Sequence, residues 1–409
     1  MHPPSLNTTM LRIKNKAMAD RTSASSVEPL RIEAKKYTRP VSIQTIGQAI
    51  TESVATHRSE ILGALARQAL IAEAELTPKP GLVDRRGSGA HTDLSLALMR
   101  RSAFTIEPFI RRMAFQSMNE QPSAQLRATL AATGRAAEKA MLRATKGSNT
   151  HKGAIWTLGL LAAAAAGRYE LPTTPSLRRD QVHNLVRSCS EGGPQRSDGG
   201  PLIRCRNAAS RPNFDPISIA RTAGLIASFE DPDHEWTRRR PSAMAGRLRI
   251  NTNRDRLQLA SHGQIVAQKF GVNGARGEAI NGFPHIVELG LPMLRGRRRA
   301  GVPEHIARLD ALLAIMAKLD DTCLLYRGGK EALQAAKEGA TAVIDAGGAG
   351  SIRGQKCLFA LDQRLLDLGV SPGGSADLLA GTLFLDAIER QQTQIPASET
   401  DKRKLTDRV

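Results

Sequence analysis

Aromatic residues are scarce in this sequence, because Phe, Trp and Tyr together make up 3% of its 409 residues. Alanine and leucine are abundant instead, which favours close helix packing over strands built from β-branched and aromatic residues. No strand-like segments alternate with helices, as a doubly wound sheet would require. We therefore expect an all-α, multi-helix globular domain, for which 41% hydrophobic residues can supply a sizeable core.

Paired cysteines and long apolar runs are also missing. The four cysteines, Cys189, Cys205, Cys323 and Cys357, show no C-x-x-C spacing, so neither a zinc site nor a disulfide framework is indicated. The N-terminal stretch has no continuous apolar segment, and the apolar run at 158–166 is too short to span a bilayer. We expect a soluble protein, and a reducing cytoplasm is the simplest location.

Acidic residues are too few to balance the basic ones, and the formal net charge is +19. Such a charge attracts polyanions through solvent, whether nucleic acid, an anionic membrane surface or a phosphorylated small molecule. Charge alone does not choose among these three partners.

Lysine is absent from residues 178–256, although arginine is frequent there and Pro, Gly and Ser interrupt the apolar periodicity. We expect a disordered basic insertion at about 187–256. The alternative is that part of this stretch is translated from a shifted reading frame in a GC-rich gene. Within it, only residues 218–229 have the pattern of an amphipathic helix.

Composition divides the rest of the chain into three parts. Residues 1–41 lack apolar periodicity and are expected to be a disordered basic extension, and 394–409 a polar tail. Residues 42–393 are expected to form a single all-helical domain, with glycine-rich connecting loops between its helices. A first helix is indicated by apolar spacings of three and four from Ile61 to Leu70. Further helices are expected around 91–115, 123–142, 153–166, 261–270, 304–326, 331–345 and 375–390.

The first polar motif, at 75–84, is a helix that ends in a turn, E-L-T-P-K-P-G-L-V-D. Two prolines around Lys79 leave few backbone options, so the turn can hold Lys79 and Asp84 in fixed directions. An ordinary helix-terminating loop with solvated charges is the alternative. Shortly after it, Asp93 is expected to cap the next helix.

The second motif, K-G-S-N-T-H-K-G at 146–153, leads directly into an apolar helix. Free N–H groups and the positive dipole end at a helix N-terminus suit a phosphate group, although the glycine spacing of a P-loop is missing. Alternatively, Asn149 or Thr150 only caps the helix and His151 is a surface imidazole.

The third motif, at 271–284, surrounds Arg276 and Glu278 with glycines. Arg276 can bind phosphate oxygens through its planar fork, while Glu278 can accept a proton or hold the arginine. A structural salt bridge between Arg276 and Glu278 explains the pair equally well.

The fourth motif, L-D-D-T-C-L-L-Y-R-G-G at 319–329, places two adjacent carboxylates in an apolar helical stretch. Neighbouring residues on a helix diverge by about 100°, so Asp320 and Asp321 cannot share one direction. One can face a site, as a proton-transfer group or an Mg²⁺ ligand, while the other braces Thr322 or an arginine. The alternative is a partly exposed acidic pair at a helix edge.

The fifth motif, S-P-G-G-S-A-D at 371–377, enters another apolar helix, and Ser375 is a natural helix cap. Asp377 near that N-terminus either compensates the helix dipole or binds a metal ion or a ribose. Dipole compensation is slightly favoured when Asp377 is considered alone.

Taken together and in this order, the five motifs resemble the signature of the triphosphoribosyl-dephospho-CoA synthase family. The resemblance extends from about 62 to 390, apart from the poorly matching stretch near 187–256, and implies an all-helical catalytic domain. In this family the 2'-hydroxyl of dephospho-CoA attacks the ribose C1' of ATP and adenine leaves. The product is the prosthetic-group precursor of malonate decarboxylase or citrate lyase. A phosphoribosyl-dephospho-CoA transferase then passes it to an acyl carrier protein.

The resemblance also implies roles for individual residues. Substrate and phosphate binding fall to Lys79, Gly147, Asn149, Thr150, Lys152, Arg276, Arg327, Ser371, Gly373, Gly374 and Ser375. Proton transfer and cation stabilisation fall to Glu278, Asp320, Asp321 and Asp84, with His151 as an adenine-side donor. Mg²⁺ is expected to assist, with Asp321 and Asp377 as candidate ligands. One departure is Lys146, where relatives usually have glycine.

Two other functions stay open on the sequence alone. Paired aspartates and phosphate-binding loops would equally suit a Mg²⁺-dependent hydrolase of nucleotides or ADP-ribose. The positive charge and the arginine-rich stretch would suit a nucleic-acid-binding protein, but aromatic stacking positions are nearly absent. We expect ATP and dephospho-CoA as partners, and neither a membrane nor a nucleic acid.

Overall fold

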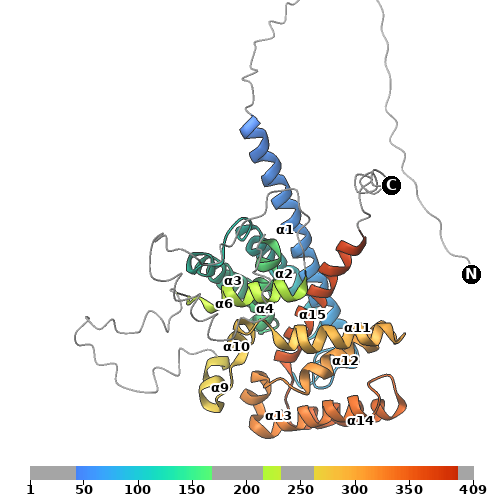
Figure 1. The fold of residues 1–409 in the computed structure, drawn as a ribbon. Helices are drawn as coiled ribbons and strands as arrows, with labels where there is room; N and C mark the ends of the chain where they lie inside the picture. The colour runs from blue at the N-terminus through green and yellow to red at the C-terminus, as the bar shows by residue number, and fades with distance from the viewer. Residues whose placement is uncertain (1–42, 168–214, 232–261, 395–409) are drawn as a thin grey trace, which may run out of the picture. The chain divides into compact units, whose positions relative to one another are not determined.

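The computed structural model of the chain describes residues 43–167, 215–231 and 262–394 (Figure 1). Within these ranges the regular structure is helical, and the pairing of Asp84 with Gly87 is an isolated β-bridge rather than a strand. The prediction of an all-α fold is therefore confirmed. The predicted extension at 1–41, the tail and most of the arginine-rich stretch lie outside the described residues.

The chain forms two compact units, Met1–Gln48 and Ala49–Val409. Only the beginning of helix α1 (Ile43–Glu75) is described in the first unit. The fold and the site that follow belong to the second unit. None of the described helices is long and apolar enough to cross a membrane.

One group of helices packs around α4, whose residues are apolar on nearly every face. Its members are α2 (Leu96–Gln116), α3 (Ala124–Ala144), α4 (Lys152–Ala166) and α6 (Pro216–Ser228). Serine side chains start two of them, since Ser95 accepts from the Leu98 amide and Ser123 from the Leu126 amide. A helix without a polar face is stable only inside a core, and α4 contacts α2, α3, α6 and α15 (Figure 1). The amphipathic helix predicted at 218–229 is confirmed as α6.

The second group runs from α9 to the C-terminal end of the described chain. Its members are α9 (His262–Phe270), α10 (Gly274–Ile280), the π-helix η1 (His285–Gly290), α11 (Leu291–Arg299), α12 (Glu304–Met316), α13 (Thr322–Asp345), α14 (Ile352–Asp367) and α15 (Gly373–Gln394). Helices α13 and α14 pack side by side, as Figure 1 shows. Helix α15 reaches from this group to α4 and so joins the two groups.

One predicted helix is wrong in a way that matters for the site. The helix expected over 304–326 is two helices, α12 and α13, with a break at 317–321. Asp320 and Asp321 therefore precede α13 instead of lying within a helix, and Asp321 is its N-cap. Helix α13 itself bends at Gly329, whose φ of 65° and ψ of −157° are not helical.

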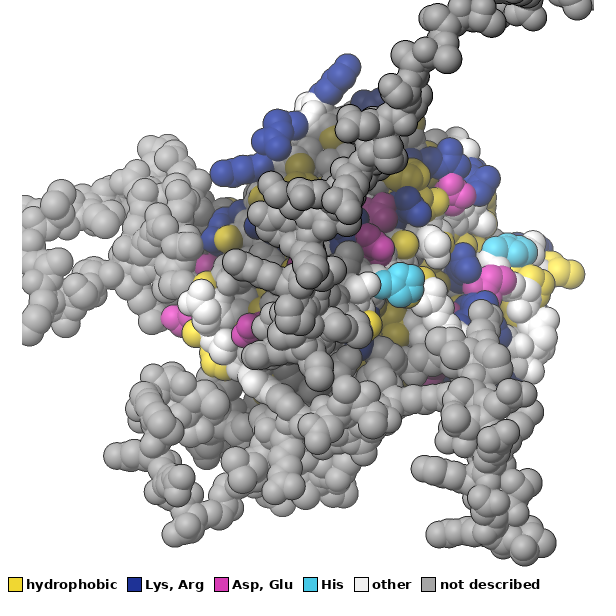
Figure 2. All heavy atoms as spheres, turned by 90° about the horizontal axis from the view of Figure 1, so that it is seen from above, with side chains coloured by type: hydrophobic (Ala, Val, Ile, Leu, Met, Phe, Trp, Pro, Cys, Tyr) yellow, Lys and Arg dark blue, Asp and Glu magenta, His cyan; other side chains and the backbone are white. Residues whose placement is uncertain are grey.

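Figure 2 shows one face of the molecule from above. On the described part of this face, basic side chains lie among acidic and hydrophobic ones. The excess of positive charge is thus not gathered into one unbroken patch on this face.

Candidate active site

The turn after α1 is built around a buried ion pair. Lys79 is 1% exposed, and its Nζ lies 2.5 Å from Oε1 of Glu73, which is 3% exposed. Because a buried charge without a partner is strongly unfavourable, each of these groups stabilises the other in place. Glu73 precedes the motif in the helix and was not predicted from the sequence.

Asp84 closes the same turn. Its two oxygens accept hydrogen bonds from the amides of Lys79 and Arg86 at 2.9 and 2.7 Å, and from Nε of Arg86 at 2.9 Å. Arg86 also reaches Asp362 on α14 at 2.6 Å, and Asp362 in turn accepts from the Gly81 amide at 2.9 Å. With its oxygens occupied in this way, Asp84 fixes the turn that presents Lys79.

His151 lies buried at the N-terminus of α4 and is not the surface imidazole of the alternative interpretation. It is 2% exposed, and its Nδ1 lies 2.7 Å from Ser102 Oγ. Burial, followed by the charge of Lys79, lowers the pKa of His151 to about 3, so the ring is neutral at pH 7. Its Nε2 is buried without a hydrogen-bond partner. This ring nitrogen is therefore a buried polar atom whose hydrogen-bonding capacity is unused.

The rest of the second motif is divided between helix ends. Oδ1 of Asn149 accepts from the Lys152 amide at 3.2 Å, and the Gly147 amide donates to Leu142 O at the end of α3 at 2.7 Å. Lys152 is half-exposed and its Nζ lies 3.2 Å from Glu138 on α3. Thr150 donates to Ser102 at 2.7 Å, in the same group as His151. The polar groups of this loop are thus bonded to one another and to α2 and α3.

Asp377 approaches the N-terminus of α4 from α15. A Cβ on Gly153 would lie 2.0 Å from Asp377 Oδ2, so only glycine leaves room for the carboxylate at this position. Burial raises the pKa of Asp377 well above its ordinary value, and the nearby charges of Glu73 and Asp321 raise it further. The hydrogen bond with the Ala154 amide acts in the opposite direction. Glu73 and Asp321 therefore both lie close enough to Asp377 to act on it through their charges.

Asp321 joins the N-termini of two helices. Its Oδ1 accepts from the amides of Cys323 at 2.9 Å and Gly374 at 3.2 Å. Its Oδ2 accepts from the amide and the hydroxyl of Ser375 at 2.8 and 2.9 Å. Burial raises the pKa of Asp321, although these hydrogen bonds work against the increase. Asp320 differs completely, since it is 54% exposed and pairs with Lys337 at 2.6 Å.

A histidine that the sequence did not place in the site joins the fourth and fifth motifs. His91 lies between Arg327, 3.3 Å from its Nδ1, and Ser371, whose Oγ is 2.7 Å from its Nε2. Because a guanidinium only donates, Nδ1 must accept and the Nε2–H must donate to Ser371. Burial and the charge of Arg327 lower the pKa of His91 to about 4, which keeps the ring neutral. The Ser371 hydroxyl can then donate its own proton to a ligand.

Glu278 pairs with a histidine rather than with Arg276. Its Oε1 accepts from the His285 amide at 3.0 Å, and its Oε2 lies 2.8 Å from His285 Nδ1. Burial alone would lower the pKa of His285, but the hydrogen bond and charge of Glu278 outweigh it and raise the pKa. Arg276 is exposed on the same helix, so the predicted Arg276–Glu278 salt bridge is not formed. His285 directly follows G-F-P in the third motif and could have been found there.

The five motifs lie next to one another in the fold. Residues of different motifs meet in several pairs: Asp321 with Gly374 and Ser375, Asp377 with Gly153, and Gly274 with Thr322. His91 bridges Arg327 to Ser371, and Lys79 of the first motif acts on His151 of the second through its charge. The N-termini of α4, α13 and α15 thereby come together. Among the predicted site residues, Asp320 and Lys152 instead make ion pairs at the surface.

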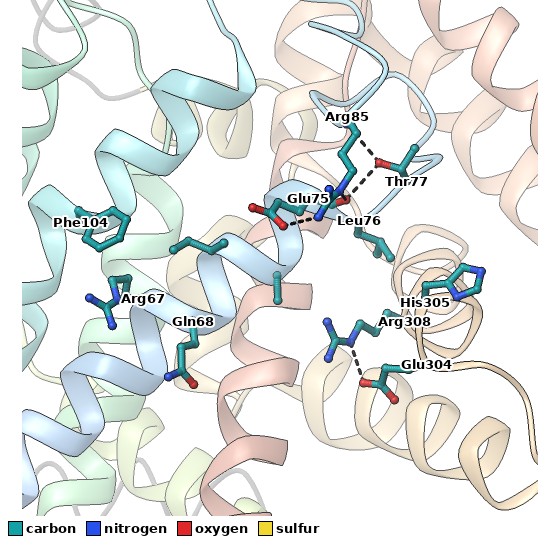
Figure 3. Close-up of a pocket in the computed structure, with 12 residues that line it drawn as sticks. Arg67, Gln68, Glu75, Leu76, Thr77, Arg85, Phe104, Glu304, His305 and Arg308 are labelled. Carbon is teal, nitrogen blue, oxygen red and sulfur yellow. Dashed lines mark hydrogen bonds and ion pairs between the residues drawn. The ribbon is translucent and has the colours of Figure 1, made fainter. Parts of the chain in front are cut away.

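A separate pocket of about 740 Å³ lies behind the turn, between α1, α2 and α12 (Figure 3). Its walls are formed by Arg67, Gln68, Ile71, Ala72, Glu75, Leu76, Thr77, Arg85, Phe104, Glu304, His305 and Arg308. Arg85 bonds to Thr77 and Glu75 on one side, and Arg308 bonds to Glu304 on the other. None of the predicted site residues lines this pocket.

Comparisons with known proteins agree with the motifs. The model of a family described as ATP:dephospho-CoA triphosphoribosyl transferase matches residues 59–196 and 200–395. A probable 2-(5''-triphosphoribosyl)-3'-dephosphocoenzyme-A synthase of Pseudomonas paraeruginosa is 43% identical over 344 residues, covering 83% of this chain and 96% of the relative. A protein of the same name in Stutzerimonas stutzeri is 43% identical over 341 residues, covering 83% and 96%. No solved structure matches.

These matches show that the chain belongs to the triphosphoribosyl-dephospho-CoA synthase family, whose members are transferases. The resemblance stated from the five motifs is confirmed, as is the prediction of an enzyme. The matched ranges include most of the arginine-rich stretch, whose predicted boundaries stay a prediction.

Proposed function

We propose that the enzyme joins ATP to 3'-dephospho-CoA, forms 2'-(5''-triphosphoribosyl)-3'-dephospho-CoA and releases adenine. The observation that carries this proposal is the meeting of five polar motifs and three helix N-termini in one region. Helix N-termini present free amides and a positive dipole end, which suit the phosphates of both substrates. The description of the matched family names both substrates, ATP and dephospho-CoA.

Two arginines are the proposed contacts to phosphate oxygens. Arg276 and Arg327 are both exposed, and Arg327 has a hydrogen bond with the neutral His91. Among the described residues, no acidic side chain forms an ion pair with either arginine. Lys79 is engaged by Glu73 and is proposed to act by holding that carboxylate near Asp377. Ser371 and the amides of Gly373, Gly374 and Ser375 are proposed to complete the binding surface.

Negative charge is proposed to stabilise the ribosyl centre, which becomes oxocarbenium-like as adenine leaves. Burial and the charge of Glu73 raise the pKa of Asp377, so a cation held beside Asp377 would favour its ionised form. His151 is neutral, and its unpartnered Nε2 is the proposed adenine-side contact.

Glu278 is proposed as the base that accepts the proton of the attacking 2'-hydroxyl. Its hydrogen bond with His285 fixes the carboxylate and gives the proton a second position 2.8 Å away. Asp320, Asp321 and Asp84 are less suited to this step. The first is exposed and paired with Lys337. Asp84 accepts three hydrogen bonds and Asp321 four, whereas Glu278 has two, both with His285, among the described residues.

Mg²⁺ is proposed to arrive with ATP and to neutralise part of the triphosphate charge. Among the described residues, no three His, Cys, Asp or Glu side chains form a group that could hold a metal ion. Asp321 does not fit as a ligand because amides and a hydroxyl occupy both oxygens. Asp377 remains the candidate protein ligand.

The product is proposed to serve a phosphoribosyl-dephospho-CoA transferase, which attaches it to an acyl carrier protein of malonate decarboxylase or citrate lyase. The cytoplasm is the proposed location. The support for both statements is the resemblance of the five motifs to the family.

The proposal is tested by measuring free adenine chromatographically after incubation with ATP, dephospho-CoA or both. Adenine should form only with both substrates, whereas adenine or phosphate from ATP alone would indicate a nucleotide hydrolase. Glu278→Gln should reduce kcat by about 10²-fold or more, as expected for removal of a general base. The matched control Asp320→Asn should stay within about threefold of wild type, because its charge is exposed and paired.

A further inference from the structure

A buried arginine outside the five motifs has no acidic ion-pair partner in the part of the chain that the structure describes. Arg127 on α3 is 8% exposed, and its guanidinium lies 4.9 Å from the centre of the Trp156 ring on α4. Its Nε is buried without a hydrogen-bond partner. Among the described residues, no carboxylate forms an ion pair with it.

Two of the three charged side chains that act on Arg127 are positive. Burial is the main factor that lowers the pKa of Arg127, and Arg276 and Arg135 lower it further. Asp231 acts in the opposite direction, but its carboxylate is bonded to Arg135 at 2.5 Å. A buried guanidinium without a counter-ion is unfavourable, so a bound anion would stabilise this arrangement.

Two further features place Arg127 beside the third motif. Trp156 Nε1 donates to the carbonyl of Ala275 at 3.1 Å, which fixes the ring against α10. The next residue is Arg276, which is exposed and lies close enough to act on Arg127 through its charge. The tryptophan therefore stands between two helices, α3 and α10. Each contributes an arginine that has no acidic ion-pair partner among the described residues.

We propose that Arg127 and Arg276 together bind the phosphate chain of a nucleotide substrate at the junction of α3, α4 and α10, with Trp156 as a positioning residue. Guanidinium groups bind phosphate oxygens through paired N–H donors, and stacking on an aromatic ring keeps their donors directed. This inference rests on the proposed function for the identity of the nucleotides. ATP carries a triphosphate and dephospho-CoA a diphosphate, so both contain the required group.

Binding to the full-length protein tests the proposal without any turnover. ATP, 3'-dephospho-CoA and phosphate-free adenosine are titrated separately by calorimetry against wild type, Arg127→Met and Arg276→Gln. Loss of a charged hydrogen bond should weaken the affinity for one of the two phosphorylated nucleotides about tenfold in each variant. The nucleotide affected identifies the source of the phosphate, and adenosine should change by less than about twofold.

A matched control and a stability measurement separate binding from a structural role. Arg143 is exposed near the end of α3, and Arg143→Met removes the same charge from the same helix without changing nucleotide affinity. Because Arg127 is an unpaired buried charge, Arg127→Met should leave the melting temperature of the ligand-free protein unchanged or raise it. Arg276 is exposed, so Arg276→Gln tests the site even where Arg127→Met folds poorly.

Trp156 provides a direct optical readout. The chain contains two tryptophans, so a Trp236→Phe variant reports on Trp156 alone. The nucleotide that binds at this junction should change Trp156 emission, and Arg127→Met should abolish the change. Affinities within about twofold of wild type in Arg276→Gln, or no change in Trp156 emission with either nucleotide, would overturn the proposal. Arginine-dependent ATP binding without adenine release would instead refute the proposed function and leave this inference standing.

Discussion

Removal of the Asp321 carboxylate should destabilise the fold far more than removal of its neighbour. Asp321→Ala deprives the N-termini of α13 and α15 of their shared acceptor and leaves the amides of Cys323, Gly374 and Ser375 without it. Loss of a helix cap costs about 1 kcal/mol, and each buried amide left unsatisfied costs about 1–3 kcal/mol. Since Cys323 and Gly374 are only partly buried, we expect a total loss of about 3–5 kcal/mol.

Asp320→Ala is the matched control, because Asp320 and Asp321 are adjacent and carry the same charge. The ion pair of Asp320 with Lys337 is at the surface, and such pairs contribute about 0–1 kcal/mol. Asp321→Asn should fall between the two, because one oxygen is kept while an amide group faces the donors of Ser375.

Urea unfolding followed by circular dichroism measures the three free energies directly. Equal losses in Asp321→Ala and Asp320→Ala, within about 1 kcal/mol, would refute the interpretation that Asp321 links two helix N-termini. If the dependence of the unfolding free energy on urea concentration differs among the variants, the mutations change the unfolded state instead.

Three further predictions concern titration and backbone strain. The pKa of His285 is raised in the fold by Glu278, so this stabilisation is present below pH 6.5 and is lost as pH rises through the folded value. The melting temperature of wild type should therefore exceed that of Glu278→Gln by more at pH 6 than at pH 9, and an equal gap would contradict the coupling. The pKa of His151 is about 3 in the fold, so the unfolded chain takes up a proton first as pH falls below 6.5. His91 titrates in the same sense, so the drop in stability between pH 7 and 5 should be about 2 kcal/mol smaller in His151→Gln than in wild type, and denaturant titrations at the two pH values measure this difference. Lys146 has a φ of 57°, where L-residues cost about 1 kcal/mol, so Lys146→Gly should stabilise the protein by several tenths of a kcal/mol while Lys146→Ala should not, as thermal melting would show.

Much of the fold was predictable because its signals are local. Alanine- and leucine-rich helices with glycine and proline between them follow from spacing alone, and α6 was found even within the arginine-rich stretch. The break before α13 was not found, because the residues on both sides of it are apolar and continue a helical spacing. Asp321 accepts hydrogen bonds from three backbone amides. Only these tertiary contacts show that a new helix begins there.

The site was predictable as a set of motifs but not as a set of contacts. Gly153 and Asp377 are far apart in sequence, and nothing local indicates that the glycine makes room for the carboxylate. Glu73 and Arg127 lie inside helices where a charged residue is ordinary, so their burial follows only from tertiary packing. His285 could have been predicted from the sequence, since it follows the third motif directly.

The most direct test of the central claim is mass spectrometry of the reaction of the purified enzyme with ATP and 3'-dephospho-CoA. Transfer of the triphosphoribosyl group predicts a single new species whose mass equals the two substrates minus adenine. It should be absent when either substrate is omitted. Breakdown of ATP to smaller nucleotides, with dephospho-CoA unchanged in mass, would contradict the claim.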